Sequence, residues 1–140
     1  MNAQANNDRR RVKVGAIMQK PVLATTVRAS VRDVASQLVV NRFSGMPVAD
    51  RDGTVVGIVT EADIIRALVE GKPLETLVAS DIMSSNPTTV DVETPIDDVM
   101  KILQDRHILR VPVTDRGKLT GIVSRSDLIK VVLEPEFMAF

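Results

Sequence analysis

An internal repeat constrains the fold of this 140-residue chain more than any other feature of its sequence. Met18 and Met83 lie 65 positions apart, and Pro47 and Pro112 have the same spacing. Further along, the spacing is 64 positions for two more pairs, Gly57 with Gly121 and Asp63 with Asp127. Several matches in nearly one register indicate two copies of a unit of about sixty residues.

The change in spacing places a one-residue deletion in a turn of the second copy. The first copy has four residues at 50–53, where the second copy has three at 115–117, and both segments end in glycine. Hairpin loops tolerate such length changes. Each segment is therefore expected to join two strands of a hairpin.

Each copy carries one clear helical stripe. In the first copy, apolar residues follow the spacing of one helix face: Val31, Val34, Ala35, Leu38 and Val39. Ser30 is suited to cap this helix. The second copy repeats the stripe after Pro95, a residue suited to a first helical turn, with Ile96, Val99, Met100 and Leu103.

The remaining elements follow the same order in both copies. Short strands are expected at about 46–50 and 54–59, then a helix at about 61–70, which Gly71 and Pro73 end. The corresponding segments of the second copy are 111–115, 118–123 and 125–133. An extended segment precedes each first helix, near 23–27 and 88–92. The order within each copy is βαββα.

These elements predict an α+β fold of two βαββα units that pack through their sheets, because a sixty-residue unit alone is marginal in stability. The expected boundaries are a disordered basic tail at 1–13, a first repeat at 14–70, a linker at 71–77, a second repeat at 78–134 and a C-terminal tail at 135–140.

Composition excludes several functional classes. Aromatic residues make up 2% of the chain, with no Trp or Tyr, so aromatic platforms for nucleic-acid bases are nearly excluded. Eighteen basic residues balance eighteen acidic ones, so no overall charge attracts a polyanion. The absence of Cys and a single histidine, His107, argue against disulfides, thiol nucleophiles and zinc sites. No apolar run resembles a signal or a membrane span, and a cytoplasmic protein is expected.

The two tails suggest contacts of their own. Arg9, Arg10 and Arg11 form a basic cluster that leaves nucleic-acid binding open as an alternative, although a solvated tail is favoured. The C-terminal segment holds Phe137 and Phe140, two of the three phenylalanines in the chain. We expect this segment to cover a hydrophobic patch on its own protomer or on a dimer mate.

At three places the repeated motifs resemble the tandem cystathionine-β-synthase (CBS) domain pair, or Bateman module, over about residues 14–134. The motifs are Ile17-Met18 with Ile82-Met83, Met46-Pro47-Val48 with Val111-Pro112-Val113, and GIVTEAD (57–63) with GIVSRSD (121–127). The resemblance implies pseudo-twofold symmetry and two clefts between the sheets that hold AMP, ADP, ATP or S-adenosylmethionine. It also implies a homodimer that regulates an effector protein, which the sequence does not identify.

Two pairs of polar residues are the leading ligand candidates. Thr60 and Asp63 lie at the start of a predicted helix, where free N–H groups and the helix dipole favour a phosphate. The Asp63 carboxylate can accept hydrogen bonds from both ribose hydroxyls. Ser124 and Asp127 repeat this arrangement. The same spacing is also typical of a helix-capping box that needs no ligand.

Further candidates surround these pairs. Gly57 and Gly121 are expected to allow close approach of the strand backbone. Six apolar strand residues are candidates to sandwich the adenine: Met46, Val48, Ile58, Val111, Val113 and Ile122. Arg110 matches a family position that can contact phosphate, whereas its counterpart Gly45 cannot, so the two sites are expected to be unequal. Arg66 and Arg125 are interpreted as solvent-facing helix residues.

The chain offers no nucleophile with a base, no metal cluster and no paired carboxylates for catalysis, so it is not expected to be an enzyme. The favoured hypothesis is a regulatory module that senses an adenosine-containing nucleotide and signals to a partner protein. The alternative is a structural homodimerisation module without a physiological ligand.

Overall fold

The computed structural model describes residues 12–133. Residues 1–11 of the expected N-terminal tail and the C-terminal tail at 135–140 lie outside the described residues. Residues 12 and 13, which the expected tail includes, are described and contact the second-repeat unit. Lys13 forms a β-bridge with Pro95, and the carbonyl of Val12 accepts a hydrogen bond from the N–H of Ile96 at 3.0 Å.

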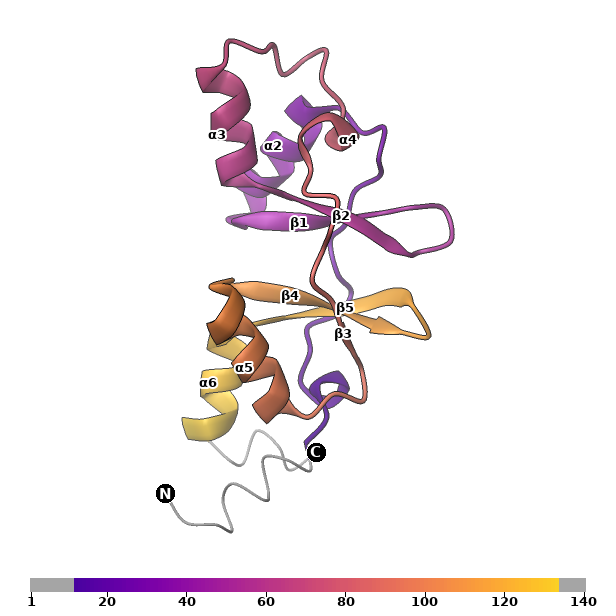
Figure 1. Ribbon diagram of the computed structural model, residues 1–140, viewed down its shortest axis with the longest axis vertical. Helices are drawn as coiled ribbons and strands as arrows, with labels where there is room; N and C mark the ends of the chain where they lie inside the picture. Colours follow the sequence, from indigo (N-terminus) through magenta and orange to yellow (C-terminus); the bar gives the residue numbers. More distant parts are fainter. Residues whose placement is uncertain (1–11, 134–140) are drawn as a thin grey trace. The chain divides into compact units, whose positions relative to one another are not determined.

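An α+β fold is confirmed, and the helices and hairpins follow the predicted order (Figure 1). The strand expected near 23–27 is reduced to a single bridge between Thr25 and Val48, whereas its counterpart near 88–92 forms a two-residue strand. The helical elements are η1 (Val14–Ala16), α2 (Val31–Asn41), α3 (Glu61–Val69), α4 (Ala79–Ile82), α5 (Ile96–Arg106) and α6 (Arg125–Leu133). The strands are β1 (Gly45–Ala49), β2 (Val55–Thr60), β3 (Val90–Asp91), β4 (Arg110–Asp115) and β5 (Lys118–Ser124). None of the helices within residues 12–133 has the length and apolar composition that a membrane crossing requires.

The chain forms two compact units, and their boundaries differ from those of the sequence repeats. The first-repeat unit consists of residues 23–87, and the second-repeat unit combines the residues up to Val22 with those from Thr88 onward. In each unit, two helices cover one face of an antiparallel hairpin: α2 and α3 cover β1–β2, and α5 and α6 cover β4–β5 (Figure 1).

The two hairpins share one register. Met46 pairs with Val59 and Val48 with Gly57, as Val111 pairs with Val123 and Val113 with Gly121. Each hairpin then has an irregularity before its turn, between Val48 and Ala49 or between Val113 and Thr114. In the shorter turn, Arg116 and Gly117 both have positive φ, at 54° and 79°, as a two-residue hairpin turn requires.

Each unit has its own hydrophobic core between the helices and the hairpin. In the first-repeat unit the fully buried residues include Val31, Val34, Leu38, Met46, Val48 and Val59. The matching residues of the second-repeat unit are Ile96, Val99, Leu103, Val111, Val113 and Val123. The predicted stripes therefore supply the helical side of both cores through Val31, Val34 and Leu38 of α2 and their counterparts on α5. Including Val39 in the buried stripe was wrong, because its side chain is 75% exposed. The predicted cap also forms, because the Ser30 hydroxyl accepts from the N–H of Asp33 at 3.1 Å.

The segment that precedes each repeat's first helix begins in the unit of the other repeat. Val14 of η1 is fully buried in the second-repeat core, and its N–H donates to the carbonyl of Thr94 at 2.8 Å. Likewise, Ala79 of α4 is fully buried in the first-repeat core, and its N–H donates to the carbonyl of Ala29 at 2.8 Å. Each compact unit is thus assembled from both sequence repeats.

We call this packing of a segment from one repeat into the unit of the other the exchange. In each unit, the exchanged segment also packs a methionine against a strand glycine. A Cβ atom at Gly121 would lie 2.5 Å from Sδ of Met18 and 2.9 Å from the carbonyl oxygen of Gln19. A Cβ atom at Gly57 would lie 2.5 Å from Sδ of Met83 and 2.8 Å from the carbonyl oxygen of Ser84. The close backbone approach predicted for the two glycines is present, and its cause is this packing.

The stretch predicted as a linker contributes to the first-repeat unit. Leu74 and Leu77 are partly buried and pack against the first-repeat core. The N–H of Val31 donates to the carbonyl of Leu77 at 2.9 Å. Residues 71–77 therefore fold back onto the unit that they leave.

A double-mutant cycle tests the exchange. We expect Gly121→Ala to lower the free energy of unfolding by about 1–3 kcal/mol, because the added methyl group overpacks a filled site. Its effect should couple to Met18→Ala, whereas Gly57→Ala should be additive with Met18→Ala. Urea unfolding measures the free energy of unfolding of each single variant and of the two double variants. Ser36→Ala, on the exposed face of α2, is the control. Coupling of Met18 to Gly57 instead would contradict the exchanged packing.

Candidate functional site

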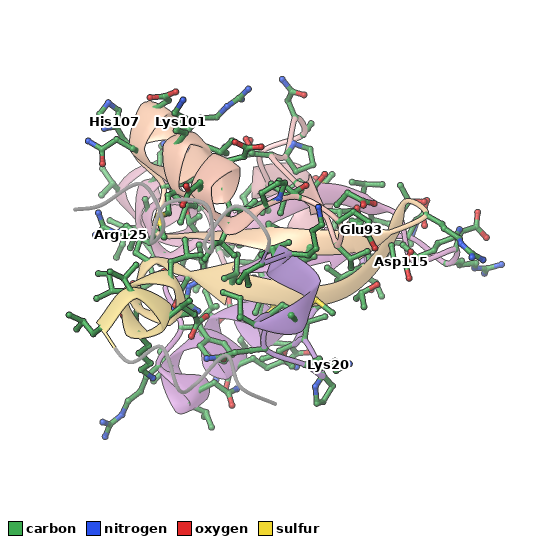
Figure 2. The ribbon with its side chains drawn as sticks, turned by 90° about the horizontal axis from the view of Figure 1, so that it is seen from below. Lys20, Glu93, Lys101, His107, Asp115 and Arg125 are labelled. Carbon is green, nitrogen blue, oxygen red and sulfur yellow. The ribbon has the colours of Figure 1, made fainter. Side chains whose placement is uncertain are left out.

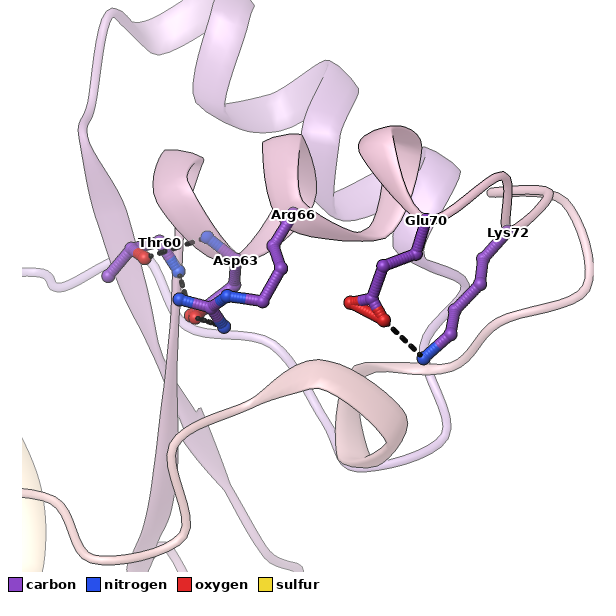
Figure 3. A network of polar contacts seen from close by, with 5 residues as sticks. All are labelled: Thr60, Asp63, Arg66, Glu70 and Lys72. Carbon is purple, nitrogen blue, oxygen red and sulfur yellow. Dashed lines mark hydrogen bonds and ion pairs between the residues drawn. The ribbon is translucent and has the colours of Figure 1, made fainter.

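Thr60 and Asp63 meet at the start of α3 and form a reciprocal capping box. The Thr60 hydroxyl accepts from the N–H of Asp63 at 3.2 Å, and Oδ2 of Asp63 accepts from the N–H of Thr60 at 2.9 Å (Figure 3). The N–H of Glu61 donates to the carbonyl of Ser44 at 2.8 Å. A phosphate here would therefore bind through the remaining first-turn N–H groups and the Thr60 hydroxyl hydrogen.

The second carboxylate oxygen of Asp63 is held by Arg66. Nη1 of Arg66 donates to Oδ1 of Asp63 at 3.2 Å, and Figure 3 shows the guanidinium turned back toward the helix start. The Asp63 side chain is 12% exposed, whereas that of Arg66 is 65% exposed. Arg66 is thus solvent-facing, as predicted, but it also contacts the candidate site. The Glu70–Lys72 ion pair lies farther along the chain.

Ser124 and Asp127 form the same box at the start of α6. The Ser124 hydroxyl accepts from the N–H of Asp127 at 3.2 Å, and Oδ2 of Asp127 accepts from the N–H of Ser124 at 2.9 Å. The capping arrangement that the spacing allowed is therefore present in both units. It leaves Oδ1 of each aspartate as the oxygen that points away from the cap.

Gln19 takes the place beside Asp127 that Arg66 takes beside Asp63. Its Nε2 donates to Oδ1 of Asp127 at 2.8 Å, across 108 positions of sequence. The backbone of Gln19 also exchanges two hydrogen bonds with Ile122, at 2.8 and 3.0 Å. Sequence reasoning missed Gln19. The only available signal was its position directly after Met18, where the other copy has Ser84.

Arg110 introduces a difference between the two units. It is partly buried and opens β4 directly opposite Ser124, so it lies beside the first residues of α6. Its counterpart Gly45 lies opposite Thr60, and a Cβ atom there would be 3.0 Å from the carbonyl oxygen of Val59. The second-repeat unit therefore has a cationic residue, Arg110, next to the start of α6. At the matching position the first-repeat unit has Gly45, where the nearby backbone leaves little room for a side chain.

The apolar strand candidates separate into two groups. Met46, Val48, Val111 and Val113 are at most 1% exposed and belong to the cores under the helices. This burial argues against the expectation that these four sandwich an adenine, since core packing already occupies their side chains. Ile58 and Ile122 alternate with the core residues, so they lie on the opposite sheet face, where they are half-buried.

The other singled-out residues have local roles. His107 ends α5 in the left-handed conformation, with φ at 54°, as Arg42 ends α2 with φ at 57°. Figure 2 shows His107 and Lys101 at the outer edge of α5. Within residues 12–133, no three His, Asp or Glu side chains are grouped so as to hold a metal ion.

Comparison with known families finds the CBS domain model twice, over residues 14–70 and 79–134. Among curated proteins, the chain is 29% identical over 132 residues to protein MK0525 of Methanopyrus kandleri. The match covers 93% of this chain and 66% of that relative, so the chain spans just under two thirds of the length of MK0525.

Two solved structures share the fold and were obtained with adenosine compounds. The CBS domain pair of protein MJ0100, in complex with 5′-methylthioadenosine and S-adenosyl-L-methionine, has a TM-score of 0.75 and 29% identity. That match covers 85% of this chain and 94% of the MJ0100 pair. CBSX2 in complex with AMP has a TM-score of 0.76 and 28% identity, over 89% of this chain and 98% of CBSX2.

The capping boxes predict a stability effect that needs no ligand. Thr60→Ala and Ser124→Ala each remove the acceptor for a first-turn N–H group and should lower the free energy of unfolding by about 1 kcal/mol. Urea unfolding measures the loss. Ser126→Ala is the matched control, because Ser126 is exposed in the same turn of α6. If Ser124→Ala is no more destabilising than Ser126→Ala, the hydroxyl does not stabilise the helix.

Proposed function

Because the chain belongs to the CBS domain family, as a tandem pair of CBS domains, we propose that it is a regulatory module that binds an adenosine-containing ligand and signals to a partner protein. One observation carries the proposal. Each unit repeats a hydroxyl and a carboxylate at the start of a helix that directly follows a strand. CBS domain neighbours in complex with AMP, S-adenosylmethionine and 5′-methylthioadenosine support the ligand class.

The two carboxylates are suited to recognise ribose. In each capping box Oδ2 is committed to the backbone, whereas Oδ1 accepts from a long and exposed side chain, Arg66 or Gln19. A ribose hydroxyl can replace that donor, because an exposed side-chain contact of this kind contributes little net stability. Asp63 and Asp127 would then hold the sugar while the caps remain intact.

The phosphate and the adenine would bind on either side of the ribose. A phosphate at the helix start gains the helix dipole and the hydroxyl of Thr60 or Ser124. Ile58 and Ile122 supply an apolar surface for the purine next to each site. Their N–H and carbonyl groups are already bonded to Ser84 and Gln19, so they contribute side-chain contact only.

The two sites should differ in ligand preference. Arg110 adds a cation beside Ser124, and a guanidinium forms charge-assisted hydrogen bonds with phosphate. The first-repeat unit has Gly45 at this position. We therefore infer that the second-repeat site favours ligands with more phosphate charge, and that the first-repeat site accepts adenosine ligands with less.

Ligand binding in the second-repeat unit would also release Gln19 from Asp127. Gln19 belongs to the segment that connects the second-repeat unit to the first-repeat unit at Leu23. Differential binding of this kind is what a regulatory ligand needs in order to shift a population of conformations. A partner protein that binds one of these conformations more tightly would respond to the shift.

A structural homodimerisation module is the second candidate, and one observation favours it. Helices α2 and α3 of the first-repeat unit expose apolar residues that are 49–82% accessible: Val39, Val40, Ile65, Leu68 and Val69. An apolar patch of this kind is typical of an association surface. This candidate predicts that two copies associate through α2 and α3 and that no adenosine ligand binds.

Thermal unfolding with and without ligand separates the two candidates. The melting temperature is compared in the absence of ligand and with AMP, ADP, ATP, S-adenosylmethionine or NAD in excess. A ligand at about 100 times its Kd should stabilise the fold by about 2.7 kcal/mol, which raises Tm by several degrees. Asp63→Ala or Asp127→Ala should remove part of this rise.

Asp81→Ala is the matched control for both aspartates. Oδ2 of Asp81 accepts from the N–H of Val78 at 2.8 Å, so its loss also removes a helix cap but lies outside the candidate sites. The ligand-induced rise in Tm should survive in this variant. No rise with any of the ligands would refute the sensor proposal and leave the homodimerisation module.

Arg110→Gln tests the inequality of the two sites. It should weaken AMP binding by about 10-fold to 100-fold, since a hydrogen bond to a charged group contributes about 1.5–3 kcal/mol. Binding of 5′-methylthioadenosine, which has no phosphate, should stay unchanged. Calorimetric titration measures both constants, with Lys118→Gln at the other end of β5 as control. Equal weakening for both ligands would show that Arg110 does not read the phosphate.

A further inference from the structure

One oxygen of the Asp127 carboxylate is occupied by a side chain from a distant part of the sequence. Nε2 of Gln19 donates to Oδ1 of Asp127 at 2.8 Å, and Oδ2 accepts from the N–H of Ser124 at 2.9 Å. Gln19 and Asp127 belong to the same compact unit. Because Oδ2 belongs to the helix cap, Oδ1 is the atom on which the proposed function places a ribose hydroxyl. The Gln19 amide and a ribose therefore approach the same oxygen.

The backbone of Gln19 is held firmly against β5. The N–H of Gln19 donates to the carbonyl of Ile122 at 2.8 Å, and the N–H of Ile122 donates to the carbonyl of Gln19 at 3.0 Å. The preceding residue, Met18, packs its sulfur atom against Gly121 of the same strand. Since the backbone is fixed, only the side-chain torsions of Gln19 have to be ordered when its amide bonds to Asp127. This lowers the entropic cost of the contact.

The first-repeat unit has the same backbone arrangement with a different side chain. Ser84 exchanges two backbone hydrogen bonds with Ile58, at 2.9 and 3.1 Å, as Gln19 does with its own strand. Oδ1 of Asp63, however, accepts from Arg66 of its own helix at 3.2 Å. The amide donor from the exchanged segment thus distinguishes the second-repeat site from the first-repeat site.

We propose that Gln19 is a specificity-determining residue of the second-repeat site, because it competes with the ribose of a ligand for Oδ1 of Asp127. This inference rests on the proposed function, in which the aspartate accepts from ribose hydroxyls. A hydroxyl that bonds to Oδ1 replaces the amide of Gln19, so one hydrogen bond to the carboxylate is lost for each one gained. Gln19 therefore weakens the contribution of the ribose to binding.

Exposure explains why the two donors compete. Gln19 is exposed, whereas Asp127 is partly buried and directs Oδ2 to the backbone of Ser124. A ligand that approaches the carboxylate from solvent therefore meets the side chain of Gln19 at Oδ1. The amide is readily displaced, because an exposed side-chain contact adds little net stability.

The size of the effect follows from how often the Gln19 contact is formed. The apparent affinity of a site falls in proportion to the fraction of molecules that are ready to bind. A contact formed for about 50–90% of the time therefore raises the Kd of the site by about 2-fold to 10-fold. Removal of the Gln19 side chain should lower the Kd by the same factor.

Gln19 and Arg110 act on different parts of the ligand. Arg110 lies opposite Ser124 in the hairpin and is proposed to contact phosphate, so its effect depends on phosphate charge. Gln19 contacts the carboxylate that receives the ribose, so its effect depends on the ribose hydroxyls. AMP and 5′-methylthioadenosine both contain these hydroxyls. The loss of Gln19 should strengthen binding of both, whereas the loss of Arg110 should weaken binding of AMP.

An NMR titration of Gln19→Ala tests the competition at the second-repeat site. The Kd is taken from the amide signals of Ser124 and Asp127 for AMP, 5′-methylthioadenosine, 2′-deoxy-AMP and 3′-deoxy-AMP. We expect the first two ligands to bind about 2-fold to 10-fold more tightly than in the unsubstituted protein. The deoxy analogue that lacks the hydroxyl bound to Oδ1 should gain nothing, because it leaves Gln19 in place. The ratio of the Kd of that analogue to the Kd of AMP should therefore rise.

The other unit supplies the controls. Ser84→Ala changes the residue that corresponds to Gln19 and should leave this ratio unchanged at the second-repeat site. In Gln19→Ala, the Kd followed at the amides of Thr60 and Asp63 should also stay the same, because these residues belong to the first-repeat unit. A merely destabilising substitution would not increase affinity at one site and spare the other.

The side-chain amide of Gln19 gives a direct readout in the unsubstituted protein. Its NH2 signals should differ from those of Gln37 and Gln104, which are exposed on helices. Saturation with AMP should move the Gln19 signals toward the positions of the other two, because the ribose displaces the amide from Asp127.

Two results would overturn the inference while AMP still binds. One is an unchanged or higher Kd for AMP in Gln19→Ala, which would show that Gln19 is a spectator or supports the ligand. The other is equal tightening for AMP and both deoxy analogues, which would show that the ribose contact is not involved. If none of the ligands changes the signals of either protein, the proposed function itself fails and this inference fails with it.

Discussion

A methionine packed onto a strand glycine, twice, is the contact on which the organisation of this chain depends. Met18 covers Gly121 and Met83 covers Gly57, so closely that neither glycine has room for a Cβ atom. Beside each pair, the residue after the methionine exchanges two backbone hydrogen bonds with β5 or β2. Because these contacts join segments of different repeats, neither sequence repeat contains a complete unit. The chain has to leave the second-repeat unit at Val22 and return to it at Thr88.

The same exchange gives the two capping boxes different neighbours. The boxes themselves are local and almost identical, with the same pair of distances in both units. The exchanged segment, however, brings Gln19 to Asp127, whereas the residue after Met83 is serine. Asp63 instead receives Arg66 from its own helix. A charged donor thus holds the carboxylate of Asp63, and a neutral donor holds that of Asp127. Arg110 lies opposite Ser124, whereas the residue opposite Thr60 is Gly45, which carries no charge. The same motif is therefore surrounded by different charges in the two units.

Features set by neighbouring residues were predictable from the sequence, and features set by distant residues were not. The Ser30 cap, the helical stripes and the hairpins depend on spacings of a few residues. The exchange could not be predicted, because the two methionines occupy equivalent positions in the repeats and so do the two glycines. The sequence therefore does not distinguish pairing within a repeat from pairing between repeats. The strand faces were ambiguous since β1, Gly-Met-Pro-Val-Ala, is apolar on both sides and lacks a period of two. Gln19 left no pattern because its partner lies 108 positions away.

Binding of an adenosine ligand at the two helix starts is the central claim, and backbone NMR during a titration with AMP tests it most directly. The account predicts that the amide signals of Thr60, Asp63, Ser124 and Asp127 shift most. It also predicts that the pair beside Arg110 saturates at the lower AMP concentration. The claim is contradicted if these four amides stay unchanged while the rest of the spectrum responds, or if no amide responds at any AMP concentration.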